Sequence, residues 1–400
     1  MDKPVFTGKF TQQSPIPDAG IEAAVDVLRS GRLHRYNTLG DELSDTALLE
    51  REYARWQGSD YCLACASGGQ AMIIALRAAG VKPGDKVLTN AFTLAPVPGA
   101  ISATGAAPVL VEITEDLVLD LDDLAAKAAT SDARFLLLSH MRGHLVDMTR
   151  LMAITNAHNI TVIEDCAHTM GATWAGEKSG NFGLAGCFST QTYKHMNSGE
   201  GGLLTSNDPS FMARAIILSG SYMLFARHGT PPAIEHFAEA KLEMPNNSAR
   251  MDNLRAAILR PQLRGLAQDI DNWNKRYHTV AGKLATCAAA MLPDRPPQGH
   301  FVGSSIQWRV PGIDQTGAEG LLRRLASRGV EIKWFGGTEP NGFTSAHQSW
   351  HYVAPHQLPA TDGILACLFD MRLPLSFSID DCALIGDILV DEISATNLAI

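Results

Sequence analysis

Two ionisable residues, Asp165 and Lys194, define the chemistry that this chain could carry. Asp165 follows the apolar run 161–163 in the segment Val-Ile-Glu-Asp-Cys-Ala-His, and Lys194 lies in the segment Gln-Thr-Tyr-Lys-His-Met-Asn-Ser-Gly-Glu-Gly-Gly. A lysine can form a Schiff base with an aldehyde cofactor, and a carboxylate can keep a pyridine nitrogen protonated. The pair therefore indicates pyridoxal phosphate as the cofactor, but it says little about the substrate.

Each of the two residues also has a plainer interpretation. A lone lysine is most often a surface residue, and an aspartate at a strand end often caps the next helix. Burial beside a cationic cofactor would remove the proton of Lys194, and only the neutral amine attacks an aldehyde. Glu164 points to the opposite face of an extended strand, so Asp165 is the predicted partner of the ring nitrogen.

A short glycine-containing loop offers a place for the cofactor's phosphate. The segment Ser67-Gly68-Gly69-Gln70 lies between a predicted strand and a predicted helix. Glycines let the backbone approach a phosphate, and the first turn of a helix presents free N–H groups and the positive end of its dipole. Such loops are common, so this motif gains its weight from Asp165 and Lys194.

These residues must be positioned by an alternation of helices and short apolar strands, which runs from about residue 17 to 260. Near-continuous apolar strands that alternate with helices predict a mostly parallel sheet with helices on both faces. In such sheets the ligand lies beyond the carboxyl ends of the strands, after Cys65, Thr89, Leu138 and Ile163. The predicted strands are 61–65, 86–89, 108–111, 134–138 and 160–163, and the predicted helices are 21–28, 48–56, 70–79 and 148–157.

The pattern changes after about residue 245 and predicts a second, smaller domain. A large domain over 1–245, with an N-terminal arm and helices at 1–58, would then precede an α+β domain over 246–400. The expected elements are a helix over 251–266, a longer one through 284, a proline-rich connection over 292–299, a strand over 304–310, and helices over 318–327 and 378–393. Ser378 and Asp381 form a predicted capping box for the last helix.

Composition narrows the class of protein. The 400 residues are 46% hydrophobic and 19% charged, which is typical of a globular chain of enzyme size. The formal net charge of -9 argues against nucleic acid as the main partner. No apolar run is long enough to cross a membrane, and the start lacks the apolar core of a signal peptide, so the cytoplasm is expected. Cys62 and Cys65 have the spacing of a redox motif, but core packing is favoured.

The order of these motifs resembles the PLP-dependent sugar aminotransferases of the DegT/DnrJ/EryC1/StrS family, which have fold type I. The resemblance extends from about Ser30 to the C-terminus, and its specific motifs lie between Ala66 and Gly202. It implies a Schiff base on Lys194. Some relatives carry histidine in place of this lysine and act as dehydratases, so the lysine here implies transamination.

The same resemblance implies further cofactor contacts. Gly68, Gly69 and Gln70 occupy the family's phosphate loop, with Gln70 where threonine or serine is usual, and Ser189 would be a second phosphate ligand. His168 would lie near the ring and its 3-oxygen. The side chain that stacks on the ring is usually aromatic; Leu94 holds that position here, so either Leu94 or the nearby Phe92 could serve. The implied cofactor contacts are thus Ser67, Gly68, Gly69, Gln70, Leu94, Asp165, His168, Ser189 and Lys194.

A homodimer with shared active sites is also implied by the resemblance. In relatives, an asparagine and an arginine before a helix reach the cofactor phosphate of the partner subunit. Asn247 and Arg250 are the chosen residues, with Arg250 as a substrate contact; Asn246 leaves the register open, and a helix-capping role is the alternative.

The expected activity is transfer of an amino group from glutamate or glutamine to a keto sugar, nucleotide-linked, or to a keto-cyclitol. Rival hypotheses are a PLP-dependent lyase, dehydratase or epimerase, a PLP-binding regulatory protein without turnover, and a protein that binds no PLP. His140 could border the pocket, and metal binding by His140 and His144 is disfavoured. Acceptor contacts are not predicted; candidates are His347, Trp350, His351, Tyr352 and Arg372.

Overall fold

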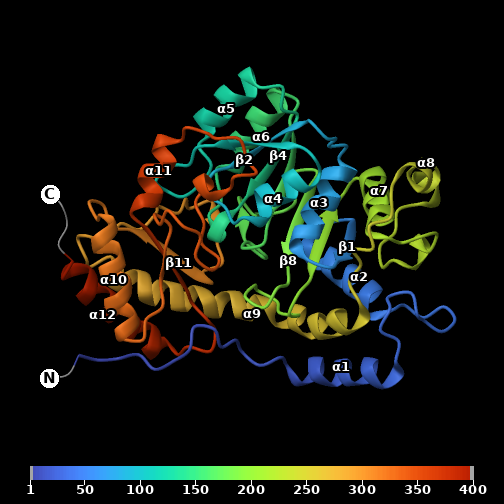
Figure 1. Ribbon diagram of the computed structural model, residues 1–400. Helices are drawn as coiled ribbons and strands as arrows, with labels where there is room; N and C mark the ends of the chain where they lie inside the picture. Colours follow the sequence, from blue (N-terminus) through green and yellow to red (C-terminus); the bar gives the residue numbers. More distant parts are fainter. Residues whose placement is uncertain (1–2, 397–400) are drawn as a thin grey trace.

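The computed structural model describes residues 3–396 and contains one large sheet and two small ones (Figure 1). The seven strands of the large sheet lie in the order β1-β9-β8-β5-β4-β2-β3. All of them run parallel except β9, which is antiparallel to both of its neighbours. The predicted fold class is therefore confirmed. The strands are β1 (Tyr61–Cys65), β2 (Lys86–Asn90), β3 (Ala107–Val111), β4 (Phe135–Ser139), β5 (Thr161–Asp165), β8 (Ala185–Ser189) and β9 (Gly202–Ser206).

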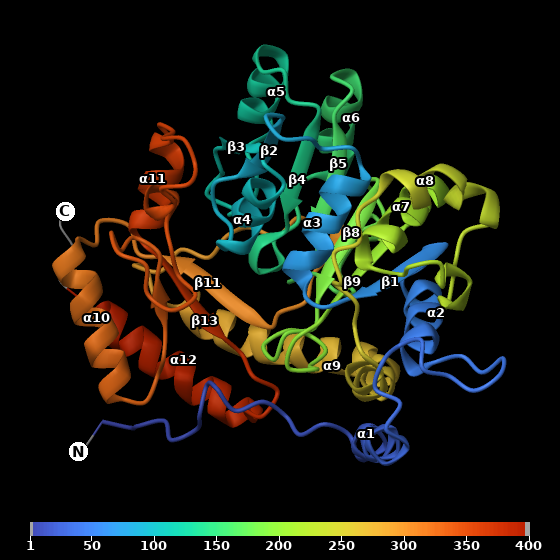
Figure 2. The same ribbon diagram turned by 45° about the vertical axis from the view of Figure 1, so that its right-hand side comes forward.

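Both faces of the large sheet are covered by helices, because successive strand residues point to opposite sides. Leu63 packs in the apolar layer under α3, α4, α7 and α8, whereas its neighbours Cys62 and Ala64 pack in the layer under α2, α5, α6 and α9. Figure 2 shows the two groups of helices on either side of the strands. The helices are α2 (Asp45–Gln57), α3 (Gly68–Ala78), α4 (Pro96–Ala103), α5 (Leu121–Thr130), α6 (Met148–Ala157), α7 (Pro209–Ser219), α8 (Phe237–Glu243) and α9 (Asn253–Leu284).

The C-terminal part of the chain forms a smaller α+β unit beside the large sheet (Figures 1 and 2). Its antiparallel sheet has the order β11-β13-β12, and helices α10 and α12 pack on it. The capping box of α12 is formed by Ser378 and Asp381, as predicted. The elements are β11 (Ser305–Arg309), α10 (Gln315–Ser327), β12 (Lys333–Trp334), α11 (Pro359–Ala366), β13 (Leu368–Arg372) and α12 (Ile379–Ser394).

The remaining elements are short, apart from α1 (Asp18–Ser30), which packs on α9. A three-stranded sheet of order β10-β6-β7 joins the two units. Its strands are β6 (Thr173–Trp174), β7 (Glu177–Lys178) and β10 (Gly299–His300), and the 3-10 helices are η1 (Met141–Gly143), η2 (Phe225–Arg227), η3 (Ile234–His236) and η4 (His347–Ser349).

One expectation about the helices was wrong. Two successive helices were predicted after residue 251, but α9 is a single helix of 32 residues with Pro261 inside it. Proline removes a backbone donor and disfavours a helix interior. Here Leu259, Leu263 and Leu266 keep the helical period across the proline and are buried in the large core, so tertiary packing offsets the local penalty.

Two further expectations can be compared with the structure. Cys62 and Cys65 are free thiols buried in the core, as expected. Among the helices formed by residues 3–396, none has the length and apolar character needed to cross a membrane. The proposed domain boundary at residue 245 stays a prediction.

Candidate active site

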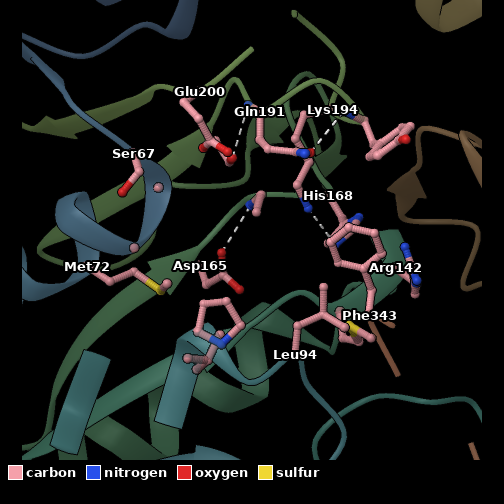
Figure 3. Close-up of a pocket in the computed structure, with 18 of the residues that line it drawn as sticks. Ser67, Met72, Leu94, Arg142, Asp165, His168, Gln191, Lys194, Glu200 and Phe343 are labelled. Carbon is pink, nitrogen blue, oxygen red and sulfur yellow. Dashed lines mark hydrogen bonds between the residues drawn. The ribbon is translucent and has the colours of Figure 1, made fainter. Parts of the chain in front are cut away.

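A cavity of about 370 Å³ lies at the carboxyl ends of the parallel strands, between the large sheet and the C-terminal unit. Segments that follow β1, β2, β4 and β5 all contribute to its wall, as the sequence predicted for a parallel sheet. Figure 3 shows these side chains projecting into one space. The predicted residues that line it are Ser67, Gly68, Gly69, Leu94, Asp165, His168, Ser189 and Lys194.

Asp165 is the last residue of β5 and lies in the wall of the cavity. Its Oδ2 accepts a hydrogen bond from Ser139 Oγ at 2.9 Å, and its Oδ1 accepts one from the Ala167 backbone N–H at 3.1 Å. Burial raises the pKa of this carboxyl, and the positive charge of Lys194 opposes that rise. The carboxylate is thus fixed in place, and a cation opposite it would favour its ionised form.

Glu164 faces away from the cavity, as the strand alternation predicted. Its carboxylate accepts hydrogen bonds from the backbone N–H groups of Gly180, Phe182 and Gly183 and contacts His140 Nε2 at 2.9 Å. The idea that His140 borders the pocket was therefore wrong, because its ring is held by Glu164 on the other side of the strand.

Lys194 lies in the loop between β8 and β9, with its Nζ 2.9 Å from His168 Nε2. Burial, and then the nearby guanidinium of Arg142, lower the pKa of Lys194 to about 7, whereas Asp165 opposes the shift. Burial, and then the charge of Lys194, hold the pKa of His168 well below its usual value. A neutral imidazole nitrogen can accept a hydrogen bond from the lysine amine, so His168 orients Lys194 Nζ.

The other end of the cavity is built from the start of α3 and the end of β8. Ser67 caps α3, because its Oγ accepts a hydrogen bond from the Gln70 N–H at 3.1 Å. A Cβ added at Gly68 would lie 2.8 Å from Ser189 Cβ, so only glycine lets the helix start approach Ser189 this closely. The helix end, its dipole and the two hydroxyls together suit a phosphate.

Gln70 does not lie in the cavity wall; its backbone N–H is used by Ser67. A side-chain contact from Gln70 to a cofactor therefore finds no support here. The two candidates for the stacking position are separated: Leu94 lines the cavity, whereas Phe92 is buried and packs edge-to-face on Phe335 at a centroid distance of 5.1 Å. Phe92 is thus a core residue, and stacking by Leu94 stays a prediction.

Asn247 and Arg250 do not line the cavity of their own chain. Arg250 Nη1 donates to the Gly220 carbonyl at 2.7 Å, and its guanidinium lies over the ring of Tyr222. The Asn247 backbone N–H donates to the Leu218 carbonyl, while the residue itself is exposed. Both residues were predicted to act on the cofactor of a partner subunit. The geometry of one chain does not test such a contact, so both assignments stay predictions.

Of the five C-terminal candidates, Arg372 reaches the cavity. His347 is paired with Asp362 at 2.7 Å and Trp350 is buried in a separate cluster, so these two have structural roles. His351 and Tyr352 are exposed and lie outside the cavity wall.

Sequence reasoning missed several residues of the wall. Arg142 lies in η1 after β4, is 4% exposed, and has a backbone φ of 56°. Phe343 comes from the loop before η4, which carried no chemical signal of its own. The missed wall residues are Met72, Pro96, Val97, Met141, Arg142, Ala167, Gln191, Tyr193, Glu200 and Phe343. A signal for Arg142 existed, because it stands in the polar segment after a predicted strand.

The cavity therefore combines three features in one space. A lysine with a depressed pKa, a buried carboxylate and a helix start flanked by two serine hydroxyls line the same cavity. These are the groups that pyridoxal phosphate requires, so the residues present fit this cofactor.

Comparison with known proteins agrees with this geometry. The model of the DegT/DnrJ/EryC1/StrS aminotransferase family matches residues 17–387. A pleiotropic regulatory protein of Geobacillus stearothermophilus is 31% identical over 63% of this chain and 61% of its own, so the chain spans less than two thirds of that relative. A dTDP-3-amino-3,4,6-trideoxy-alpha-D-glucose transaminase of Streptomyces venezuelae is 31% identical over 77% of this chain and 75% of its own.

Solved structures extend the comparison over the whole fold. The crystal structure of 3-amino-5-hydroxybenzoic acid synthase superposes with a TM-score of 0.83, covering 99% of this chain and 100% of that one at 24% identity. At this identity, the likeness shows that the two chains share a fold.

Proposed function

This chain belongs to the DegT/DnrJ/EryC1/StrS aminotransferase family, and from that membership we propose that it is a PLP-dependent aminotransferase. The amino donor is glutamate or glutamine, and the acceptor is a keto sugar, nucleotide-linked, or a keto-cyclitol. The observation that carries the proposal is the placement of Lys194 Nζ, its pKa lowered to about 7, in the same cavity as the Asp165 carboxylate.

Pyridoxal phosphate, when bound, supplies an aldehyde for the amine and withdraws electrons from the amino-bearing carbon of the substrate. When the cofactor is bound, Lys194 would hold it covalently and Asp165 would pair with its ring nitrogen. The backbone N–H groups of Gly68 and Gly69 and the hydroxyl of Ser189 would hold its phosphate.

The lysine then acts as both base and acid. Lys194 Nζ removes the proton from the donor's α-carbon, and in the return direction it delivers a proton to the former carbonyl carbon of the acceptor. His168, which contacts Lys194 Nζ, keeps the amine oriented for both proton transfers. A pKa near 7 suits both roles, because base and acid forms are then populated together at neutral pH.

We also infer a homodimer in which Asn247 and Arg250 complete the cavity of the second copy. Support comes from the surface next to Arg250, where Tyr222 is 56% exposed and Met223 is 60% exposed. Large apolar side chains left in water beside a predicted cross-subunit contact are typical of an interface.

The experiment separates the two halves of the reaction. Purified protein loaded with pyridoxal phosphate is given glutamate or glutamine alone, and conversion of the cofactor to its amine form is followed by absorbance and chromatography. A keto acceptor should then restore the aldehyde form. Reduction with borohydride should place the cofactor on the peptide that contains Lys194. Lys194→Ala should abolish both signals, and Lys283→Ala, a surface lysine paired with Asp387, should not.

The rival functions give different results in this experiment. A lyase, dehydratase or epimerase does not accumulate the amine form with donor alone. The Geobacillus stearothermophilus relative is named as a regulatory protein. A regulator without turnover would bind the cofactor but show no conversion of it with any amino acid. Either result would overturn the transaminase proposal.

A further inference from the structure

Three cationic side chains meet on the side of the cavity nearest the C-terminal unit. Arg142 comes from η1 in the large unit, Lys333 from β12 and Arg372 from β13, the strand paired with β12. Arg142 and Arg372 line the cavity beside Lys194. Lys333 does not line the cavity itself, but its Nζ lies 5.3 Å from the ring centroid of the wall residue Phe343, the same distance as the guanidinium of Arg372. Burial and the charges of Arg142 and Arg372 together lower the pKa of Lys333 to about 8, and Asp370 opposes the shift. In the paragraphs below, these three residues are called the cation cluster.

The acid opposite the cation cluster is Asp370. It is fully buried, its Oδ2 lies 2.7 Å from Arg142 Nη2, and its Oδ1 accepts a hydrogen bond from Gln307 Nε2 at 2.8 Å. Within residues 3–396, neither Lys333 nor Arg372 forms an ion pair with an acid. Asp370 thus faces three cations, of which Arg142 is buried and Lys333 and Arg372 are half-buried. An excess of positive charge withdrawn from water is costly unless an anion joins it.

Arg142 carries an unsatisfied buried donor within residues 3–396. Its side chain is 4% exposed, and among the described residues its Nε has no hydrogen-bond acceptor. The Nζ of Lys333 is likewise buried without an acceptor in that part of the chain. Buried polar groups are almost always satisfied, and a bound ion or ligand is one explanation for an exception that lies at a cavity.

The backbone and the aromatic side chains hold this arrangement in place. Arg142 has a φ of 56°, in the left-handed region that non-glycine residues rarely adopt and that gathers at functional sites. The guanidinium of Arg372 lies 3.7 Å from the ring centroid of Tyr193 and 5.3 Å from that of Phe343. Stacking fixes the guanidinium plane and leaves its N–H edge available for an oxyanion.

We propose that Arg142, Lys333 and Arg372 form an oxyanion subsite that holds a carboxylate of a substrate beside Lys194. The inference rests on the proposed aminotransferase function and adds a substrate class to it. Guanidinium groups bind carboxylates through paired hydrogen bonds, so the subsite fixes orientation as well as charge. Two sources share this chemistry: the α-carboxylate of the amino donor, and an acidic group carried by the keto acceptor.

Direct binding tests the subsite without turnover. Glutarate, an unreactive dicarboxylate, is titrated calorimetrically into the cofactor-loaded protein and into Arg142→Gln, Lys333→Gln and Arg372→Gln. We expect each variant to bind glutarate about 10-fold more weakly or worse, because a charge-assisted hydrogen bond is lost. The matched control is Arg309→Gln, an arginine on β11 of the same sheet whose guanidinium pairs with Glu115 outside the cavity. Its affinity should equal that of the wild type.

The two half-reactions then identify the source of the carboxylate. If the donor concentration needed for half-maximal conversion rises in the variants, the subsite holds the donor. If only the acceptor half-reaction is weakened, it holds the acceptor. Arg372→Lys keeps the charge and should retain part of the affinity, which separates binding from folding.

The proposal is overturned if the wild type does not bind glutarate, or if the three variants bind it and react as the wild type does. Failure of the aminotransferase function is detected by a different measurement. In that case the wild type shows no borohydride-reduced cofactor on Lys194, or no conversion of the cofactor to its amine form by the donor.

Discussion

The basicity of Lys194 is set by its surroundings. Burial and Arg142 lower its pKa to about 7. The protonated amine cannot attack an aldehyde, so below pH 7 most of the protein is unreactive, and above it the neutral form dominates. We predict that the rate of covalent cofactor attachment to cofactor-free protein rises with pH, with a midpoint near 7, as followed by stopped-flow absorbance. A midpoint near the ordinary lysine pKa of about 10.4 would contradict this prediction.

Arg142→Gln provides the companion measurement. Removing a neighbouring positive charge makes protonation of Lys194 easier, so the midpoint should move to higher pH. Arg309→Gln, away from the cavity, should leave the midpoint unchanged.

Asp165 contributes to catalysis through its charge. Asp165→Asn keeps the shape and can still contact Ser139, but it no longer stabilises a protonated ring nitrogen. We predict that cofactor attachment to Lys194 persists while amine transfer falls ~100-fold or more, the usual effect of removing one preorganised electrostatic contact. Rapid-mixing measurements of the donor half-reaction would detect this, and equal rates in the two proteins would exclude the assigned role.

The sequence revealed the site residues that stand in a local motif, and it did not reveal those that reach the cavity only through tertiary packing. Lys194, Asp165 and Ser67 stand in short motifs whose chemistry is local. Arg372 and Phe343 reach the cavity only because the C-terminal unit packs beside the large sheet. Phe92 and Leu94 could not be distinguished because both are apolar, and only packing decides which one is core.

Two elements of the site approach each other closely where β9 passes the start of α3. A Cβ added at Gly202 would lie 2.4 Å from the Ser67 carbonyl oxygen, which is backbone and cannot rotate away. Gly202→Ala should therefore shift the phosphate loop, lower stability by about 1–3 kcal/mol and weaken cofactor affinity. Urea unfolding and a cofactor titration measure the two effects.

Gly282→Ala is the matched control, because nothing lies near an added Cβ at that position of α9. It should raise stability by up to about 1 kcal/mol, since alanine favours a helix interior over glycine. A Gly202→Ala protein as stable as this control would show that the loop has room to move.

Elements with a strong hydrophobic period were predicted well, and those without one were not. β1 (Tyr61–Cys65) and α6 (Met148–Ala157) match their predicted ranges in full. β13 was missed because Asp370 and Arg372 interrupt its apolar run, and η1 because it spans only three residues. α9 was predicted as two helices with a break after residue 266. The buried residues Leu263, Leu266 and Ile270 continue one helical period across that point, and their packing in the core keeps the helix unbroken.

The homodimer can be tested by complementation. Sedimentation should give twice the 43.0 kDa mass of the chain. If Asn247 acts on the second copy, Lys194→Ala and Asn247→Ala proteins should each be impaired alone. A mixed dimer, however, contains one site with both groups intact. Mixing the two after mild dissociation should therefore restore activity, and no gain on mixing would place Asn247 outside the shared site.

Helix α9 extends under both units (Figure 1). Its 32 residues make a rod about 48 Å long, and it packs against α1, α2 and α12. Chimeras that import a C-terminal half from a relative, in order to import its choice of acceptor, are therefore constrained. A crossover placed within α9 would join two unrelated packing surfaces along one rod. A junction just before Asp252 keeps the rod whole, but the grafted helix must then fit α1 and α2 of the recipient.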